Sequence, residues 1–318
     1  MKEIHLWNFI YTHLAKNNSV VFIAVVHHEK GSPGKEGFKM AISSNGESIG
    51  SIGGGVMEYN IIAKCKEHLK KKTRINEIET LYHNRKTTVN RSGLICAGAQ
   101  TNFTYSLYKK DIEAIREISD AVKVHNPGKI IFSQKGISFS SGKNLVSQVN
   151  FTFKSKTNWN YEEPVGTKNI VYVVGSGHVG LAVCKIMSIL DFYIVVYDSR
   201  GDLQTLQDNK FADKKIIDSY KNLGNAVTED SYIIIVTTGF ESDKEAIKQV
   251  INKRLKYIGL MGTKAKIKKI FNEAVKDGIK KELLEKIHAP IGIDINSDTP
   301  EEIAISIAAE IIRQKNNS

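Results

Sequence analysis

Gly175-Ser176-Gly177-His178-Val179-Gly180 is a glycine-rich turn between two apolar runs. The run before it, residues 170–174, is short and rich in valine, which favours a buried strand. Residues 181–190 favour a helix, and a second apolar run, residues 193–197, ends in Asp198. A strand, a glycine turn, a helix, a second strand and an acid in this order form the layout of a dinucleotide-binding unit. We therefore predict a Rossmann-like unit in this half of the chain.

Each glycine of the turn has a separate expected role. Gly175 makes the tight turn, Gly177 lets the backbone approach a pyrophosphate, and Gly180 lets the helix pack closely on the strand. The first N–H groups of that helix are free to bind an anion, and His178 lies beside them. Asp198 is in the position that accepts hydrogen bonds from ribose hydroxyls. We predict that these five residues bind a nucleotide or a related anionic cofactor.

Strands and helices continue to alternate after this unit. Residues 214–218 are a candidate third strand, and the apolar runs at residues 232–236 and 257–260 predict further strands, with helical segments between them. This alternation is typical of a parallel sheet with right-handed crossovers, which binds ligands at the carboxyl ends of its strands. The residues expected along that rim are Gly175, Asp198, Thr237 and Gly262.

Two helix starts carry capping signals. Ser242, with Glu245 three residues later, is the expected N-cap of a helix over residues 242–254. Thr299-Pro300-Glu301-Glu302 is a capping box with proline at the first helical position, so we expect a helix from here to about Arg313.

The amino-terminal half has the pattern of an α+β domain. An amphipathic helix over residues 7–14, a buried strand at 20–26 and a hairpin turn at Asn45-Gly46 come first. The return strand runs into Gly53-Gly54-Gly55, which precedes a helix with Glu58 in its first turn. Three successive glycines form either an N–H nest for an anion or a tight strand-to-helix corner, and both interpretations stay open.

The chain has three cysteines, at positions 65, 96 and 184, too few and too scattered for a disulfide framework or a zinc knuckle. Cys65 lies on an apolar stripe, which is typical of a buried hydrophobe. Cys96 lies in a small loop flanked by Gly93 and Gly98, where a thiol can meet a ligand or be structural. We expect no metal site, and we expect a reducing, cytoplasmic compartment.

The length of 318 residues suggests two domains. We expect an amino-terminal α+β domain over residues 1–153 and a Rossmann-like domain over 169–318. Between them, residues 154–168 are polar and contain Pro164 and Gly166, so we expect a linker there.

The formal net charge of +11 is spread over the chain. Its densest run, Lys264 to Lys269, lies on an expected helix that also carries Glu273 and Asp277, which is typical of a solvated face. No nucleic-acid-binding signature is present, no apolar run is long enough to span a bilayer, and residues 1–16 do not have the pattern of a signal peptide. We expect neither a nucleic acid nor a membrane as a partner.

Six motifs together resemble the XdhC/CoxI proteins, the xanthine dehydrogenase accessory factors. They are Gly31-Ser32-Pro33 through Gly37 to Met40, the Gly50–Glu58 segment, Cys96-Ala97-Gly98, the Gly175–Gly180 turn, Tyr257–Gly262, and His288–Ile295 with the Thr299–Ile311 helix after it.

The resemblance implies a factor that binds the molybdenum cofactor (molybdopterin), supports its sulfuration and inserts it into a molybdenum hydroxylase of the xanthine dehydrogenase type. It implies that Gly53 to Gly55 and the Gly175–Gly180 turn hold phosphates, that Glu58 lies near the pterin, and that Cys96 approaches molybdenum or carries sulfur. The implied partners are the apo-hydroxylase and a cysteine desulfurase, and a homodimer is a further expectation. On this interpretation the chain is a maturation factor rather than a catalyst.

Three departures from the family pattern stand out. Ala97 replaces the first glycine of the Cys-Gly-Gly loop, and Pro33-Gly34-Lys35 replaces the usual proline-arginine. A histidine-rich segment of the family is here Thr238 to Asp243, without imidazoles. The last change weakens any catalytic role for that segment.

Two other functions fit the residues. The first is an NAD(P)-dependent oxidoreductase, in which Asp198 favours NAD and nearby Arg200 permits NADP. The second is an interaction protein with a vestigial nucleotide fold.

Overall fold

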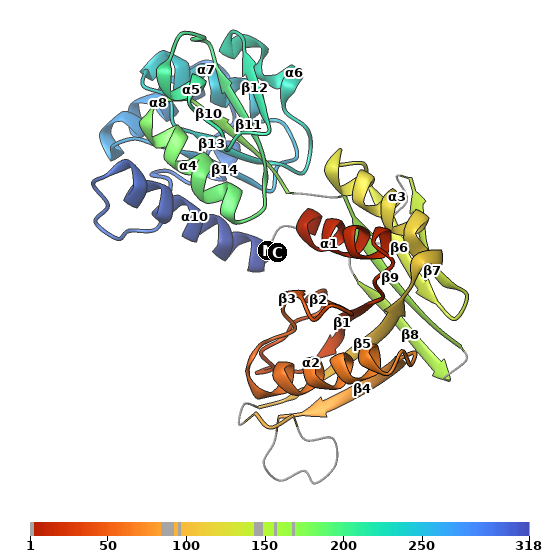
Figure 1. The fold of residues 1–318 in the computed structure, drawn as a ribbon. Coiled ribbons are helices and arrows are strands. Elements are labelled where there is room, and N and C mark those ends of the chain that lie inside the picture. The colour runs from red at the N-terminus through yellow and green to blue at the C-terminus, as the bar shows by residue number, and fades with distance from the viewer. Residues whose placement is uncertain are drawn as a thin grey trace. The chain divides into compact units, whose positions relative to one another are not determined.

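The computed structural model describes residues 3–83, 92–94, 97–142, 149–155, 158–166 and 169–317. The chain forms two compact units, Met1–Thr167 and Lys168–Ser318 (Figure 1). We describe each unit by itself.

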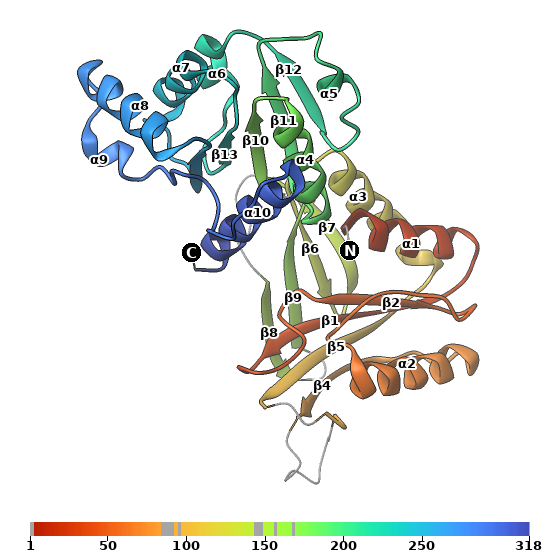
Figure 2. The ribbon, with the colours of Figure 1, turned by 90° about the vertical axis from the view of Figure 1, so that its left-hand side faces the viewer.

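The first unit is built on an antiparallel sheet in the order β3-β2-β1-β5-β4. Its strands are β1 (Val20–His28), β2 (Lys39–Ser43), β3 (Ser48–Gly50), β4 (Asn76–Tyr82) and β5 (Ala99–Leu107). Helix α1 (Glu3–Ala15) lies on one face and α2 (Gly55–Lys70) on the other (Figure 2). Both faces are therefore covered, so β1 is a continuous apolar run whose alternate residues enter two different cores.

A second antiparallel sheet of this unit has the order β7-β6-β9-β8. Its strands are β6 (Gly128–Ser133), β7 (Gly136–Ser141), β8 (Asn150–Ser155) and β9 (Asn158–Val165). The chain enters it through the 3-10 turn Lys109–Asp111 and helix α3 (Ile112–Lys123). The aromatic rings of Phe22, from the first sheet, and Phe132, from the second, stack with centroids 4.9 Å apart, so the two sheets share one core.

The linker prediction for residues 154–168 is wrong where β9 lies. Trp159, Tyr161 and Val165 of this strand are buried, as is Glu163, and they alternate with more exposed residues. The charged Glu163 at an inward position interrupts the apolar half of this alternation and hid the period of two. The division between the compact units falls at Thr167/Lys168 instead.

The second unit is a parallel sheet in the order β12-β11-β10-β13-β14. Its strands are β10 (Ile170–Val174), β11 (Tyr193–Asp198), β12 (Lys214–Ile217), β13 (Tyr232–Ile235) and β14 (Tyr257–Leu260). Its helices are α4 (His178–Ile189), α5 (Gln204–Gln207), α6 (Leu223–Ala226), which follows the 3-10 turn Tyr220–Asn222, α7 (Phe240–Val250), α8 (Lys264–Lys276), α9 (Lys281–Leu284) and α10 (Pro300–Asn317). Helices α4 and α10 share a core on one face, and α7 and α8 pack on the other. The expected fold class, a Rossmann-like parallel sheet plus an α+β unit, is confirmed.

One capping prediction is confirmed and one is wrong. The backbone N–H of Glu302 donates to Thr299 Oγ1 over 3.3 Å, and Glu302 Oε2 accepts from the Thr299 N–H, so the capping box starts α10. Helix α7 instead starts at Phe240 with Gly239 as its N-cap, so Ser242 lies inside the helix. Within the described residues, no helix has the length and apolar character needed to cross a membrane.

Candidate functional site

The glycine turn after β10 has the geometry expected from its spacing. Gly175 has φ 112°, and a Cβ there would lie 2.6 Å from the Val236 carbonyl oxygen. A Cβ on Gly180 would collide with the carbonyl oxygen of Gly175, so only glycine lets the helix pack this closely on the strand. Around Gly177, by contrast, a Cβ would meet no atom within 4 Å. The turning and packing roles of Gly175 and Gly180 are confirmed, and Gly177 faces open space.

The amino end of α4 lacks a side-chain cap. Gly177 is its N-cap residue, and no side chain in the described part of the chain accepts from its first N–H groups. His178 is the first residue of the helix and is exposed. Uncapped N–H groups and the helix dipole together favour an anion at this end.

Asp198 is buried and fully engaged by the protein. Its carboxylate accepts from the backbone N–H and hydroxyl of Ser176, at 2.7 and 2.8 Å, and from three N–H groups of Arg200 at 3.0 Å. Burial opposes ionisation of this group, but the hydrogen bonds from Arg200 and Ser176 outweigh it and lower its pKa to about 2. Asp198 therefore fixes the glycine turn, and ribose hydroxyls would have to displace these donors.

Further along the rim, the ends of β13 and β14 are closed by their own contacts. Thr237 Oγ1 donates to Asp243 Oδ1 over 2.5 Å, and Lys266 Nζ lies 2.6 Å from Asp243 Oδ2. Burial raises the pKa of Asp243 against the opposing effects of Lys266 and Thr237. These side chains join the first turns of α7 and α8. At the start of α4, by contrast, the space around the Cβ position of Gly177 is open.

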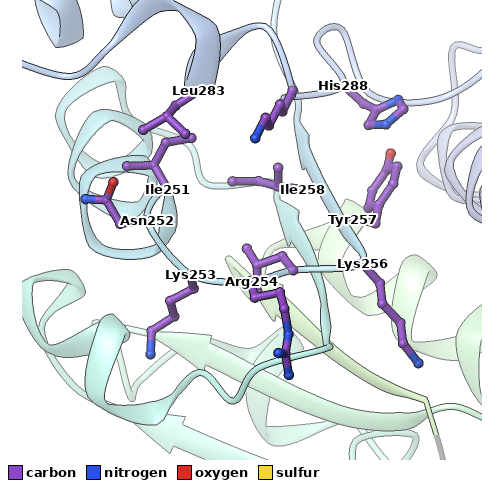
Figure 3. A pocket seen from close by; sticks show the side chains of 11 residues that line it. Ile251, Asn252, Lys253, Arg254, Lys256, Tyr257, Ile258, Leu283 and His288 are labelled. Carbon is purple, nitrogen blue, oxygen red and sulfur yellow. The ribbon is translucent and has the colours of Figure 1, made fainter.

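A hollow of about 490 Å³ lies at the opposite, amino end of β14 (Figure 3). The cationic ends of Lys253, Arg254 and Lys256 point away from Ile258 in the middle of this view. Arg254 pairs with Asp230, and Lys256 donates to Asn169. Two of its cations are thus paired, and the hollow lies at the other end of the sheet from the site expected from the strand order.

The His288–Ile295 motif is held by a buried carboxylate that the sequence pattern did not indicate. Glu310 of α10 accepts from the Tyr257 hydroxyl at 2.6 Å and from the Gly292 N–H at 2.8 Å. His288 Nδ1 lies 3.2 Å from the same carboxylate, and its ring stacks on Tyr257. These contacts give His288 a structural role beside β14.

In the first unit, the triple-glycine corner already holds an anion of the protein itself. Gly53, Gly54 and Gly55 all have positive φ, at 126°, 77° and 69°. Glu58 Oε2 accepts from the N–H groups of Ile52 and Gly54, at 2.8 and 2.9 Å. The predicted nest thus exists, and Glu58 fills the position where we expected a phosphate.

The first two amino-terminal motifs meet at one residue, Gln100. Its side-chain oxygen accepts from the Gly34 N–H and the Ser32 hydroxyl, both at 3.1 Å. Its side-chain nitrogen donates to the Ile52 carbonyl at 2.8 Å and to Asn102 at 2.7 Å. A Cβ on Gly34 would collide with the Ile52 carbonyl oxygen and with Gln100, so only glycine fits here.

Residues 97–98 of the third amino-terminal motif pack against the loop that contains Gly31. A Cβ on Gly31 would lie 3.1 Å from the Ala97 Cβ, and one on Gly98 would lie 2.9 Å from the Lys30 carbonyl oxygen. The loop around residues 31–34 is therefore packed between the triple-glycine corner and residues 97–98. Motifs that are far apart in the sequence form one loop cluster.

A buried histidine completes this cluster. His83 Nε2 lies 3.0 Å from the Ser32 hydroxyl, and its Nδ1 lies 2.8 Å from the Ser92 hydroxyl. Burial lowers the pKa of His83, so the ring is neutral near pH 7. Sequence reasoning missed His83 and Gln100, and the signal available for both was a polar residue at the end of a strand beside a glycine loop.

Cys96 lies outside the described residues, so its candidate role stays a prediction. Cys65 and Cys184 are buried, and burial raises the pKa of each thiol to about 12, which leaves them unreactive. Among the described residues, no group of three or more His, Cys, Asp or Glu side chains could hold a metal ion.

The parallel sheet with its glycine turn defines the second unit as a Rossmann-fold domain. Residues 171–311 match the model of the XdhC Rossmann domain, and residues 13–80 match that of the XdhC and CoxI family. The chain belongs to the XdhC and CoxI family.

Individual relatives are distant in sequence. The uncharacterized protein YqeB of Escherichia coli (strain K12) is 23% identical over 97% of this chain, which spans 47% of that protein. A probable xanthine dehydrogenase subunit of Bacillus subtilis (strain 168) is 29% identical over 82 residues, 26% of this chain and 23% of that protein. This chain thus matches less than half of the length of each. The crystal structure of a xanthine dehydrogenase from Bacillus halodurans has the same fold, with a TM-score of 0.75 and 20% identity over 100% of this chain and 96% of that one.

Proposed function

We propose that this protein is a maturation factor for a molybdenum hydroxylase of the xanthine dehydrogenase type. It binds the molybdenum cofactor, supports its sulfuration and hands it to the apo-enzyme. Membership of the XdhC and CoxI family supports this function, as do the two relatives that carry the name xanthine dehydrogenase. The partners would be the apo-hydroxylase and a cysteine desulfurase, in the cytoplasm.

The observation that carries the proposal is the open amino end of α4. Molybdopterin ends in a phosphate, often extended by a nucleotide, and a phosphate needs several N–H donors without other acceptors. Gly177 and His178 begin an uncapped helix, and nothing lies within 4 Å of the Gly177 Cβ position. We assign the phosphate to this end, and the net charge of +11 favours the approach of a polyanion.

The other candidate residues take narrower roles in this proposal. Gly175 and Gly180 shape the turn, and Asp198 holds Ser176 in place, so these three position the phosphate site without touching the phosphate. In the corner of Gly53, Gly54 and Gly55, the Gly54 N–H can bind a ligand only when Glu58 leaves it. The molybdenum end of the cofactor supplies the chemistry of hydroxylation after transfer, and Cys96 is our candidate for a thiol near it.

An NAD(P)-dependent oxidoreductase is less well supported. Recognition of NAD relies on an acid that accepts from the ribose hydroxyls. The acid in that position, Asp198, already accepts hydrogen bonds from Ser176 and Arg200. Arg200 is held on Asp198 and would have to leave it to reach a 2′-phosphate.

Purification from a host that makes the molybdenum cofactor tests the proposal. We expect molybdopterin to copurify with the wild-type chain, detected as its fluorescent oxidation product, and less molybdenum to be retained by Cys96→Ser. The buried Cys65→Ser is the matched control for general loss of a thiol. The proposal fails if no pterin is bound by the wild-type chain when the host is replete with molybdenum.

Fluorescence titration with NADH and NADPH separates the two functions. We expect weak binding of either nucleotide and no turnover of aldehydes or ketones. Tight binding with turnover would replace the maturation factor by an oxidoreductase.

A further inference from the structure

A groove on the second unit has an apolar floor and a basic rim. Its volume is about 710 Å³, and it lies between α8 and the segment that follows it through α9. The apolar residues that line it are Ile267, Phe271, Val275, Leu284, Ala289 and Pro290. Val275 is 47% exposed, unusually open for a valine on a helix whose other apolar residues pack on the sheet. The groove therefore offers apolar surface that the chain itself does not cover.

The rim of this groove carries an excess of positive charge. Lys264, Lys268, Lys276 and Lys281 line it, whereas Glu285 is the acid among the lining residues. Lys281 lies 3.8 Å from Glu285. The other three lysines are exposed and form no ion pair within the described residues. The rim thus has three uncompensated cations beside its apolar floor.

Helix stability explains Lys276, which lies in the last turn of α8, but it does not explain Lys264 and Lys268. Helix α8 has no acid in its first turn and begins with Lys264. A cation at the amino end of a helix opposes the helix dipole and costs about 0.3–1 kcal/mol. Lys266 in the same turn has its own partner, Asp243, whereas Lys264 and Lys268 have none in the described part of the chain. Lys264 and Lys268 lie four residues apart on the wall of the groove that α8 forms, and this placement suits a bound partner better than it suits the free helix.

We propose that this groove docks an acidic amphipathic helix of a partner protein. Apolar side chains spaced one turn apart would contact Phe271 and Val275, which are themselves four residues apart. Asp or Glu side chains of the partner helix would face Lys264, Lys268 and Lys276 of α8. The 13 residues of α8 span about 20 Å, which accommodates roughly four turns of such a helix. The proposal concerns the surface of the second unit alone and is independent of cofactor binding.

Synthetic peptides provide the probe. The first is a labelled helix of about four turns with leucines on one face and glutamates on both flanks. The second has the same composition in scrambled order, so that it keeps its charge and loses its apolar face, and the third has lysine in place of glutamate. Fluorescence anisotropy against the full chain measures each Kd. We expect the first peptide to bind at least about tenfold more tightly than either of the others, and its affinity to fall as salt is added.

Variants of the chain locate the binding. We expect Val275→Asp to weaken binding of the first peptide about tenfold or more, and Lys268→Glu to weaken it several-fold. The matched controls lie on α4: Ile189→Asp, since Ile189 is 71% exposed, and Lys185→Glu, at another exposed lysine. Both controls should bind within about twofold of wild type. Circular dichroism and thermal unfolding check that each variant is folded.

Three results would overturn the proposal. One is equal binding of the ordered and scrambled peptides, which would mean attraction by net charge alone. Another is an equal loss of peptide affinity in Ile189→Asp and Val275→Asp, which would show that the peptide binds elsewhere. The third is wild-type self-association, measured by light scattering, that Val275→Asp abolishes, because the groove would then join two copies of this chain.

Discussion

At the scale of single residues, Asp198 lies where the sequence predicts an acid, but its hydrogen-bond donors come from the protein and not from a ligand. The acid at the end of the second Rossmann strand follows from the sequence pattern alone. Its burial against Ser176 and Arg200 does not, since those contacts depend on how the turn folds back on the strand end. The result is a carboxylate that fixes the glycine turn through Ser176.

The ionisation of Asp198 predicts a pH dependence of stability. Its pKa falls from 3.8 to about 2 on folding, so the folded state favours the charged form. This contribution is fully present above about pH 4 and is lost as the pH falls towards 2; a shift of this size corresponds to roughly 2 kcal/mol. Urea unfolding of wild type and Asp198→Asn between pH 7 and about pH 2 measures it. A difference in unfolding free energy between wild type and Asp198→Asn that stays constant below pH 4 would contradict the lowered pKa of Asp198.

Gln100 marks the limit of sequence reasoning at this scale. The sequence indicates the glycine loops at residues 31–34, 53–55 and 96–98 as separate motifs. Nothing in their spacing shows that they meet, because β-sheet pairing brings them together from distant positions. A single glutamine at the start of β5 joins the first two loops through its amide, and its local signal, a polar residue beside a glycine loop, does not show which loops it joins.

Replacing Gln100 by Ala should therefore loosen the loop cluster. The Gly34 N–H and the Ile52 carbonyl would each lose a buried partner, at about 1–3 kcal/mol for such groups, so we expect a loss of roughly 3 kcal/mol in unfolding free energy. Asn60→Ala, which removes an exposed amide from α2, is the matched control and should change stability by under about 0.5 kcal/mol. Urea unfolding compares the two. A similar small effect for both would show that the network is dispensable.

At the scale of elements, the strand-to-helix corner before α2 fits both interpretations that the sequence left open, a tight corner and an N–H nest. Three consecutive glycines with positive φ make the corner, and the resulting N–H groups make the nest. Glu58, one turn into the helix, reaches back to fill it. The corner and the anion site are therefore the same structure, stabilised by the protein's own carboxylate.

Replacing Glu58 by Gln tests this contact. The amide keeps one acceptor oxygen but loses the charge, so we expect a loss of about 1 kcal/mol and faster hydrogen exchange at the Ile52 and Gly54 amides. Glu67→Gln, which removes the exposed pair with Lys71, is the control. Unchanged exchange at both amides would mean that Glu58 does not hold the corner in solution.

Strand β9 shows why some elements were missed. The parallel sheet was predictable because its strands are short apolar runs between glycine turns and helices. In β9 the inward residues are Trp159, Tyr161, Glu163 and Val165, and the charged Glu163 breaks the apolar alternation. Its burial is made possible by Tyr161, which donates to it at 2.7 Å, and by Lys39 of β2. A partner so distant in sequence cannot be inferred from local composition.

At the scale of the whole molecule, the hydrophobic cores divide as the compact units do. The core clusters around the two antiparallel sheets contain residues only from the first unit, and those on either face of the parallel sheet only from the second. Each unit thus buries its own apolar surface, which is the main condition for independent folding.

We therefore predict that residues 1–167 and 168–318 fold as separate fragments. Each should unfold cooperatively in urea, and each should have the circular dichroism of its own secondary structure. A fragment that shows no cooperative transition would mean that its core needs the other unit.

The central claim is that the open amino end of α4 holds the phosphate of the molybdenum cofactor, and Gly177→Ala tests it most directly. The backbone of Gly177, at φ −70° and ψ −170°, suits alanine, and the new methyl group would meet no atom of the protein within 4 Å. It would stand in the space assigned to the phosphate. The measurement is the amount of molybdopterin per chain after purification from a molybdenum-replete host, with Gly201→Ala as the control. We predict that the wild type and the control carry the cofactor and that folded Gly177→Ala has lost most of it. Equal pterin content in Gly177→Ala and wild type would contradict the account.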